Sequence, residues 1–500
     1  VTVTGLPEGM TYTWNYPQVS ITGASTVIGA HPYTVTATGN CGTTTTQGTV
    51  TVIGERFRMT SLATDSIYIY VASSGTLYID WGDGTSDTYT GGGWKKHFFT
   101  DGAPSHIVTG QARTITQLQC YKNQLTALDV SECAALHTLY CDYNQLTALD
   151  VTQNTALTVL TFHYNLLTEL NITNNAVLTT LSCHSNKLTT LDVAQNTELT
   201  SLHCSGNPLG TLDVTNNTAL IYLNCASNRL AALDVSKNPA LRELTCASNQ
   251  LTALNVTNNT ALTRLECQYN PLGTLDVRQN TELTYLDCTS NSLGALDVTK
   301  NPVLSTLRCS ANPLGALNVR QNTALTNLNC ANNLLTALDV EQNTELIYLS
   351  CYANLLTALD VSKNTKLINL YCYNNPLGTL DVSANLALTI LYCYNNSLAD
   401  LDVSQNTALD SLWCFNNQLT SLDVSANTTL SKLRCQSNLF DAVALDALFN
   451  TLHSNPGEKT VYIYNNPRSG ANANTGTSDC DQTIATDKDW TVDTDTPTYY

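Results

Sequence analysis

Leucine, cysteine and asparagine recur along most of the chain at a fixed spacing of 21 residues. Phe162 holds the one position in the cysteine series that has no cysteine. A leucine stands two residues before each member, from Leu118 to Leu433, and an asparagine stands three residues after each, from Asn123 to Asn438. A fixed period of this length predicts a solenoid of stacked coils. The fifteen cysteines are Cys120, Cys141, Cys183, Cys204, Cys225, Cys246, Cys267, Cys288, Cys309, Cys330, Cys351, Cys372, Cys393, Cys414 and Cys435.

Each repeat contains one short strand. In the stretch x-L-x-C-x, leucine and cysteine alternate with variable residues, so both are expected to point inward. Stacked coils then form a parallel sheet with strands about 4.8 Å apart. The asparagine lies where the chain must turn, and its buried amide is expected to satisfy backbone groups of its own and neighbouring coils. In the repeat of Cys372, the rest of a thin core is filled by Leu377, Leu380, Val382 and Leu388.

The pattern L-x-x-L-x-C-x-x-N-x-L over residues 117–440 resembles a leucine-rich repeat, in which the cysteine position is commonly leucine. The cysteine variant with LDVSxN is similar to bacterial internalin-like and Bacteroidetes surface proteins. The resemblance implies sixteen 21-residue repeats in a right-handed solenoid of mostly β structure. It also implies a parallel sheet on the concave face and short 3-10 or turn segments on the convex face.

Two modules are expected before the repeats. Residues 1–54 alternate Thr and Val between Gly, Pro and Asn, which predicts antiparallel strands of a small sandwich. They resemble a truncated immunoglobulin-like or adhesin-type domain. Residues 55–116 contain two alternating runs around the Asp83-Gly84 turn, a hairpin signal. The motif IDWGDGT resembles the polycystic-kidney-disease (PKD) repeat, and we expect this all-β module to cap the solenoid.

After Asn438 the period breaks, which predicts a C-terminal cap over residues 441–500. A helix is expected over residues 441–453. Its apolar face holds Leu445, Leu448, Phe449 and Leu452. The following stretch VYIYNNP restores a strand. Val461, Ile463 and Asn466 take the places of leucine, cysteine and asparagine in it.

Composition excludes some classes of function. The formal net charge is −18, which argues against binding nucleic acid through a basic face. No apolar run approaches the ~18 residues of a membrane span. The chain starts at Val1 without a leader, so we expect a mature or truncated product, and no anchor is visible at Tyr500.

Three interpretations compete for the cysteines: disulfides, metal ligands and small buried hydrophobes. Parallel neighbouring strands do not give the torsion near 90° of a disulfide, and a line of inward thiols offers no convergent ligands. Burial is therefore favoured, and Phe162 in one place supports it. Cys133 replaces the second repeated asparagine and is expected to be a packed thiol. Cys41 and Cys480 lie outside the series and are expected to be unpaired.

Aspartates suggest calcium at two places, and turn formation is favoured over calcium at both. The aspartate of LDV recurs twelve times in fifteen coils. The remaining three coils carry Asn171, Asn255 and Asn318. Because asparagine keeps an acceptor but loses the charge, the position suits a local turn hydrogen bond better than a metal. In the PKD-like module the corresponding residues are Asp80, Asp83 and Asp87.

The outward strand positions carry an aromatic patch in the last third of the chain, which marks a candidate ligand-binding site on the concave face. The alternative is cross-strand packing that only stabilises the sheet. The aromatic residues are Tyr348, Tyr352, Tyr371, Tyr373, Tyr392, Tyr394, Trp413 and Phe415. The amide neighbours are Asn327, Asn329, Asn332, Asn369, Asn374, Asn395 and Asn416.

A second patch lies earlier in the chain, and ordinary surface histidines are favoured there over a transition-metal site. It comprises Tyr140, Tyr143, His163, Tyr164, His184 and His203. Between the two patches we expect mutually paired, solvated charges that also suit a charged partner. They are Glu243, Arg264, Glu266, Asp287 and Arg308.

No catalytic constellation, phosphate loop or nucleophile elbow is found, so neither an enzyme nor a cofactor is expected. The sequence is interpreted as a secreted or bacterial cell-surface protein that binds a protein or glycan on its concave face. The alternative is a structural subunit of a surface matrix or filament, with self-association. An enzymatic role ranks third.

Overall fold

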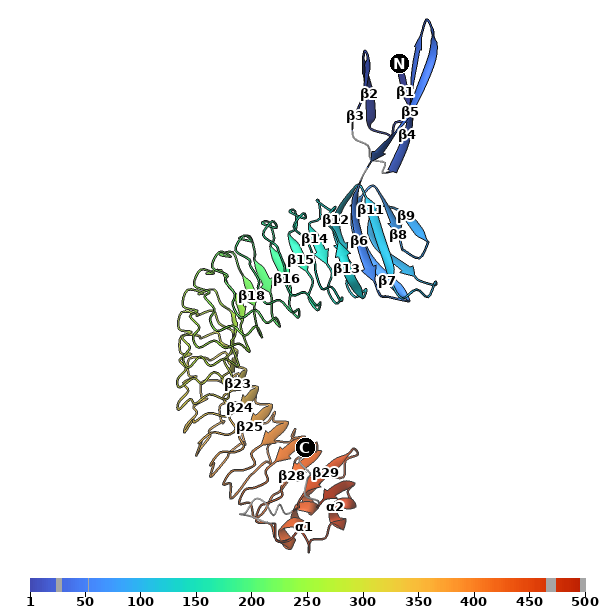
Figure 1. Cartoon of the computed structure of the whole chain (residues 1–500). Helices are drawn as coiled ribbons and strands as arrows, with labels where there is room; N and C mark the ends of the chain where they lie inside the picture. Colours follow the sequence, from blue (N-terminus) through green and yellow to red (C-terminus); the bar gives the residue numbers. More distant parts are fainter. Residues whose placement is uncertain (24–28, 53, 465–473, 495–500) are drawn as a thin grey trace. The chain divides into compact units, whose positions relative to one another are not determined.

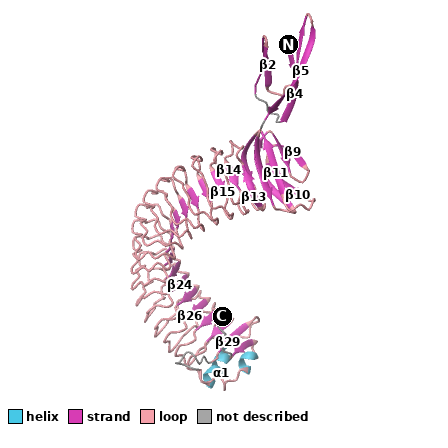
Figure 2. Ribbon diagram, in the orientation of Figure 1, coloured by secondary structure: helices cyan, strands magenta, loops and turns pink. Residues whose placement is uncertain are grey.

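The computed structural model describes residues 1–23, 29–52, 54–464 and 474–494. The chain divides into two compact units, Val1–Leu230 and Ala231–Tyr500. Strands and turns make up most of both units, as Figure 1 and Figure 2 show. Among the described residues no helix is long and apolar enough to cross a membrane.

The first unit begins with five strands in two small antiparallel sheets. They are β1 (Thr2–Thr4), β2 (Met10–Asn15), β3 (Gln18–Gly23), β4 (Gly29–Gly39) and β5 (Gly42–Val52). Strand β4 lies between β1 and β5, and β2 pairs with β3. Cys41 is exposed in the turn between β4 and β5. Within the described part of residues 1–52 only Pro7 is buried, so the immunoglobulin-like sandwich stays a prediction.

Eight further strands lead into the coils. They are β6 (Glu55–Ser61), β7 (Ser66–Ser74), β8 (Thr76–Asp80), β9 (Ser86–Thr90), β10 (Gly93–Phe98), β11 (His106–Ala112), β12 (Thr114–Gln119) and β13 (Leu125–Asp129). One sheet has the order β13-β6-β11-β8-β9. In the other, β7 lies antiparallel between β10 and β12. Strand β12 in turn pairs in parallel with the first coil strand, so this module continues the coil sheet.

Three-residue strands at the 21-residue period form the coil sheets. The first unit holds β14 (Thr138–Tyr140), β15 (Val159–Thr161), β16 (Thr180–Ser182), β17 (Ser201–His203) and β18 (Tyr222–Asn224). The second holds β19 (Glu243–Thr245), β20 (Arg264–Glu266), β21 (Tyr285–Asp287), β22 (Thr306–Arg308), β23 (Asn327–Asn329), β24 (Tyr348–Ser350), β25 (Asn369–Tyr371), β26 (Ile390–Tyr392), β27 (Ser411–Trp413) and β28 (Lys432–Arg434). Neighbouring strands are parallel, with leucine opposite leucine, as in Leu349, Leu370 and Leu391. The predicted parallel β-solenoid is confirmed.

Every coil turns at the residue two positions after the cysteine. This residue adopts positive φ, for example 59° at Tyr269 and 54° at Asn374. The following asparagine is buried in every coil except that of Cys393, where Asn396 is half-buried. Between the strands, the described parts of the coils consist of turns, bends and irregular segments. The sequence predicted either 3-10 segments or turns here, and turns are what the structure contains.

The second unit ends with α1 (Ala442–Thr451), β29 (Lys459–Tyr462), α2 (Thr483–Thr486) and β30 (Trp490–Asp493). The Asp441 carboxylate caps α1 by accepting a hydrogen bond from the Ala444 amide. All four predicted apolar residues of the helix are buried. Val461 lies opposite Leu433 in the parallel register, as predicted. Asn466 lies outside the described residues, and Asn474 accepts a hydrogen bond from the Asn438 amide at 2.9 Å and donates to the Cys435 carbonyl at 3.2 Å.

Candidate functional site

The strand face of the second unit is the surface formed by the outward side chains of β19–β28. On it, the eight predicted aromatic residues occupy consecutive coils, and all eight are half-buried. We call these residues, Tyr348, Tyr352, Tyr371, Tyr373, Tyr392, Tyr394, Trp413 and Phe415, the aromatic stripe. The structure therefore brings together every residue of the main candidate site.

One column of the stripe consists of the residues that directly follow the cysteines. The ring centroids of Tyr352 and Tyr373 lie 4.3 Å apart, those of Tyr373 and Tyr394 4.3 Å, and those of Tyr394 and Phe415 4.2 Å. All three pairs are stacked, with interplanar angles of 7° to 11°. The spacing follows from the strand separation of a parallel sheet. Each inner ring therefore has both faces covered.

A second column consists of residues that directly precede the cysteines. Tyr392 stacks on Trp413 at 4.1 Å, and Tyr371 meets Tyr392 edge-on at 5.2 Å. The Arg434 guanidinium lies 4.4 Å from the Trp413 ring and 4.5 Å from that of Tyr462. Arg434 and Tyr462 were missed by the sequence analysis, although both stand in line with the column on β28 and β29. They extend the stripe to the C-terminal cap.

The stacking determines what the stripe can offer to a ligand. Burial, with the neighbouring phenols Tyr394 and Tyr352, raises the pKa of Tyr373. The hydroxyl therefore stays protonated at neutral pH and acts as a neutral hydrogen-bonding group. Because both faces of the Tyr373 and Tyr394 rings are covered, these two residues offer their ring edges and hydroxyls for contact. That surface suits a protein segment better than sugar rings stacked on faces.

An asparagine ladder runs beside the first column. The Asn395 amide donates to the Asn374 side-chain oxygen at 2.5 Å, and the Asn416 amide donates to that of Asn395 at 2.6 Å. These three residues occupy the positive-φ position of their coils, where asparagine is one of the better-tolerated residues. The ladder gives the stripe an ordered polar edge.

The charges next to the stripe form two local pairs. The Arg264 and Glu266 side chains lie 2.7 Å apart, and the Arg264 guanidinium covers the Tyr285 ring at 3.8 Å. Arg308 approaches Asp287 at 4.0 Å. The predicted pairing is found for these four residues, but Asp287 is buried, with 6% of its surface exposed, and is not solvated. Its buried carboxylate accepts a hydrogen bond from the Thr289 amide at 3.1 Å.

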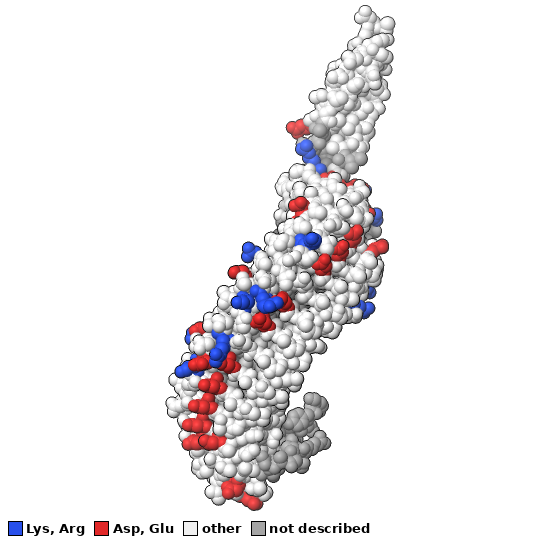
Figure 3. All heavy atoms as spheres, turned by 90° about the vertical axis from the view of Figure 1, so that its left-hand side faces the viewer, with Lys and Arg blue, Asp and Glu red and all other residues white. Residues whose placement is uncertain are grey.

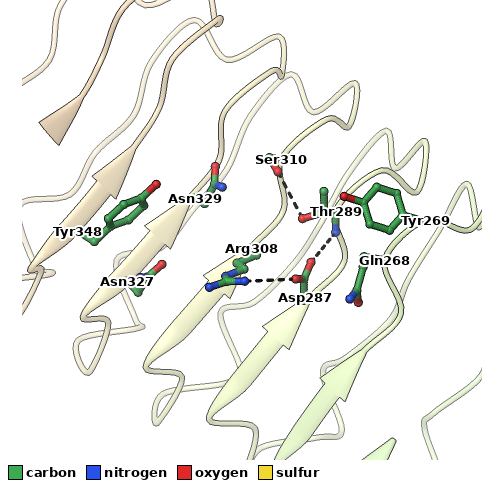
Figure 4. Close-up of a pocket in the computed structure, with 9 residues that line it drawn as sticks. All are labelled: Gln268, Tyr269, Asp287, Thr289, Arg308, Ser310, Asn327, Asn329 and Tyr348. Carbon is green, nitrogen blue, oxygen red and sulfur yellow. Dashed lines mark hydrogen bonds and ion pairs between the residues drawn. The ribbon is translucent and has the colours of Figure 1, made fainter. Parts of the chain in front are cut away.

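Asp287 and Arg308 border a hollow of about 470 Å³ in the strand face. Figure 4 shows Tyr348 and Tyr269 at opposite ends, with Arg308 and Asp287 between them. The hollow exists because the residues that follow successive cysteines are short here, namely Thr289, Ser310 and Ala331. Sequence analysis missed the hollow, although this run of short side chains marks its floor.

The second patch forms a column of imidazoles in the first unit. His184 stacks between His163 and His203, with centroid distances of 4.3 Å and 4.0 Å. Tyr143 and Tyr164 stack beside them at 4.6 Å, whereas Tyr140 lies outside these ring contacts. Burial, together with the neighbouring imidazoles His203 and His163, lowers the pKa of His184 to about 4.

The imidazoles lie in parallel planes and do not converge on a point as metal ligands would. His163 approaches the Asp142 carboxylate at 3.4 Å, and His203 bonds the Ser205 hydroxyl at 2.8 Å. Among the described residues no group of three or more His, Cys, Asp or Glu side chains is placed to hold a metal ion.

No protein-family model and no curated protein matches the chain. Among solved structures, the functional domain of InlJ from Listeria monocytogenes, described as including a cysteine ladder, is 38% identical. That match has a TM-score of 0.63 and covers 65% of the present chain and 75% of the Listeria chain. The chain is an internalin-like leucine-rich-repeat protein.

Two further structures agree on the fold. A leucine-rich-repeat protein of Leptospira interrogans is 26% identical, with a TM-score of 0.61, and covers 67% of this chain and 93% of its own. A TDR receptor is 17% identical, with a TM-score of 0.55, and covers 66% of this chain and 68% of its own. The latter likeness concerns the fold alone.

The internalin-like cysteine ladder is buried throughout: all fifteen cysteines of the series have no exposed surface, and neither has Phe162. Burial raises the pKa of Cys183 and of Cys330 to about 12. The predicted role as small buried hydrophobes is confirmed. Cys133 is buried too, and its thiol donates to the Arg56 carbonyl at 3.2 Å. Cys41 and Cys480 carry free thiols.

The aspartates of this leucine-rich-repeat chain make turn hydrogen bonds, as predicted. Asp150 accepts bonds from the Thr152 amide at 2.9 Å and hydroxyl at 2.7 Å, which lower its pKa. Asn171 accepts the same two bonds from Thr173. Figure 3 shows acidic side chains that follow one another along the surface of successive coils.

The three calcium candidates of residues 55–116 also serve local structure. Asp80 accepts from the Gly82 amide at 3.0 Å, and Asp87 accepts from the Trp81 indole at 2.8 Å. Burial opposes ionisation of Asp83, but hydrogen bonds from Thr85 and His97 lower its pKa to about 2. Each carboxylate therefore already has protein donors.

Proposed function

We propose that the chain is a non-catalytic binding protein that holds a protein partner on the aromatic stripe. Leucine-rich-repeat neighbours support a role as a protein-interaction scaffold. The observation that carries the proposal is the ordered row of ring edges and hydroxyls on four consecutive coils, from β24 to β27. Partly exposed aromatic side chains of this kind dominate the binding energy of many interfaces.

The place of action that fits this proposal is outside the cell or on its surface. The likeness to an internalin-like protein and the predicted adhesin-type modules before the coils support that placement. The net charge of −18 fits a partner with a basic or neutral contact surface rather than nucleic acid.

A triple variant tests the proposed stripe: Tyr373→Ala, Tyr394→Ala and Trp413→Ala. A partner is first captured from protein extracts on the immobilised chain and identified, and its Kd is then measured with purified components. We expect the triple variant to bind at least about a hundredfold more weakly, because aromatic interface anchors contribute about 2 kcal/mol or more each.

The control variant truncates three exposed leucine side chains in the same part of the solenoid: Leu334→Ala, Leu355→Ala and Leu386→Ala. These side chains are 50% to 58% exposed and lie off the stripe. Far-ultraviolet circular dichroism verifies that both triple variants fold. Equal affinity of wild-type and stripe variant, or equal loss in the control, would contradict the proposal. Light scattering at rising concentration identifies the case in which the partner is a second copy of the chain.

A further inference from the structure

The hollow beside the aromatic stripe has the size and lining of a small-ligand site. Its volume of about 470 Å³ lies within the roughly 300–1,000 Å³ of typical ligand pockets. Carboxylate, guanidinium, amide, hydroxyl and aromatic groups all contribute to it. The lining residues are Gln268, Tyr269, Asp287, Thr289, Arg308, Ser310, Asn327, Asn329 and Tyr348.

The charges of the hollow balance, which favours a neutral ligand. Asp287 and Arg308 carry opposite charges 4.0 Å apart. That distance is too long for a direct hydrogen bond, so both groups keep capacity for a ligand. Asp287 contributes one oxygen to the Thr289 amide, and the Arg308 side chain is 47% exposed. A strongly acidic or basic ligand would leave one of the two charges unfavourably placed.

Two further groups in the hollow have unused binding capacity. The Gln268 side-chain oxygen is buried and has no hydrogen-bond partner among the described residues, so a ligand donor would satisfy it. The Tyr269 side chain is 59% exposed. Its ring takes part in none of the ring stacks that cover the tyrosines of the stripe, and it stands at the positive-φ turn of its coil. It therefore offers an open aromatic face at the edge of a polar hollow, as Figure 4 shows.

We propose that this hollow binds a neutral sugar unit, a hexose or N-acetylhexosamine within a glycan. Neighbouring hydroxyls of a sugar both donate and accept hydrogen bonds, which matches planar side chains that present two polar atoms at once, such as Asp287, Arg308 and Asn329. The apolar C–H face of the same ring packs on the Tyr269 face. The sugar site does not depend on whether the stripe binds a protein.

The test uses the full 500-residue chain with defined probes. Saturation-transfer NMR is recorded with the methyl glycosides of glucose, galactose, mannose, N-acetylglucosamine and N-acetylgalactosamine, and an array presents neutral oligosaccharides built from them. We expect wild-type protein to bind at least one probe, and Tyr269→Ala and Arg308→Gln each to weaken its Kd by about tenfold or more. Tyr269→Phe keeps the ring and should bind within about twofold of wild type.

Arg320→Gln is the matched control, because Arg320 is also an exposed arginine paired with an aspartate, Asp339, but does not line the hollow. It should bind the probe as wild type does. Urea midpoints verify folding of each variant. The proposal is wrong if wild type binds no probe at millimolar concentration, or if Tyr269→Ala and Arg308→Gln leave probe binding unchanged. It is also wrong if these two variants weaken only a protein partner, which would assign the hollow to the protein interface.

Discussion

Most of the asparagines that follow a cysteine by three residues join backbone groups of two coils, as Asn312, Asn333 and Asn354 do. The Asn354 amide donates to the carbonyls of Cys351 at 2.9 Å and Cys330 at 3.1 Å, and its oxygen accepts from the Leu335 amide at 3.1 Å. All of these groups are buried. A strand of three residues has few ladder bonds of its own, so the side chain supplies what regular secondary structure would otherwise provide.

Replacing Asn354 with alanine should therefore be costly. Three buried backbone groups lose a partner, and we expect the free energy of unfolding to fall by about 3 kcal/mol. Urea unfolding followed by circular dichroism measures the loss. Asn258→Ala is the control, because Asn258 is exposed and its one side-chain hydrogen bond within the described residues goes to the Ser236 carbonyl at 3.2 Å. It should cost less than about 1 kcal/mol. Similar urea midpoints for the two variants would contradict the proposed contribution of the buried asparagines to stability.

At the scale of the element, the 21-residue period places identical positions of successive coils about one strand spacing apart. Neutral rings at such a position stack, as Tyr373 does between Tyr352 and Tyr394. Ionised groups at such a position repel: hydrogen bonds from Ser362 lower the pKa of Asp360, and the neighbouring Asp381 carboxylate opposes part of that lowering. A column of equivalent positions therefore stabilises or destabilises the stack of coils according to the charge of its members.

The imidazole column of the first unit is sensitive to pH for this reason. In the unfolded chain His184 takes up a proton near pH 6.5, whereas in the folded chain its pKa is about 4, because of burial and of His203 and His163. Between these values the unfolded state binds more protons, so stability falls as the pH falls. The only carboxylate described in contact with the column is Asp142, beside His163.

His184→Phe keeps a ring in the column and removes its titratable group. We expect the urea midpoint of wild type to drop between pH 7.5 and pH 5, and the drop to be smaller in His184→Phe. His137→Gln replaces an exposed histidine outside the column and should leave the drop unchanged. A drop of the same size in His184→Phe and wild type would show that the column does not cause it.

At the scale of the molecule, the sequence predicts the coils well because each repeat has the same pattern of inward leucine and cysteine positions. Leu349 and Leu370 lie opposite each other because their spacing equals the period. Ring orientation could not be predicted, because at the same strand spacing Tyr373 stacks on Tyr394 whereas Tyr371 meets Tyr392 edge-on. The hollow was missed as well, because it arises from what the short side chains of Thr289 and Ser310 leave unfilled between longer neighbours. The role of Asn474 was also missed. Asn474 takes the position of the repeated asparagine beside Asn438, but it comes eight residues later in the chain than Asn466, which the repeat pattern indicated.

The cysteine ladder makes both units sensitive to alkali. Buried thiols such as Cys183 and Cys330 have their pKa raised to about 12 by burial, whereas an unfolded chain ionises them near 9. Above that pH the unfolded state holds fewer protons, so each thiol lowers the free energy of unfolding by about 1.4 kcal/mol per pH unit. We expect the urea midpoint to fall steeply between pH 9 and pH 10.5. Replacing Cys288, Cys309 and Cys330 with alanine should lower the midpoint at pH 7 through lost packing and reduce its fall above pH 9. A midpoint that stays constant through this range would contradict the burial of the ladder as neutral thiols.

In the native protein at pH 8, iodoacetamide should modify the exposed Cys41 within minutes and leave the cysteine ladder unmodified, because thiolate and access are both needed for alkylation.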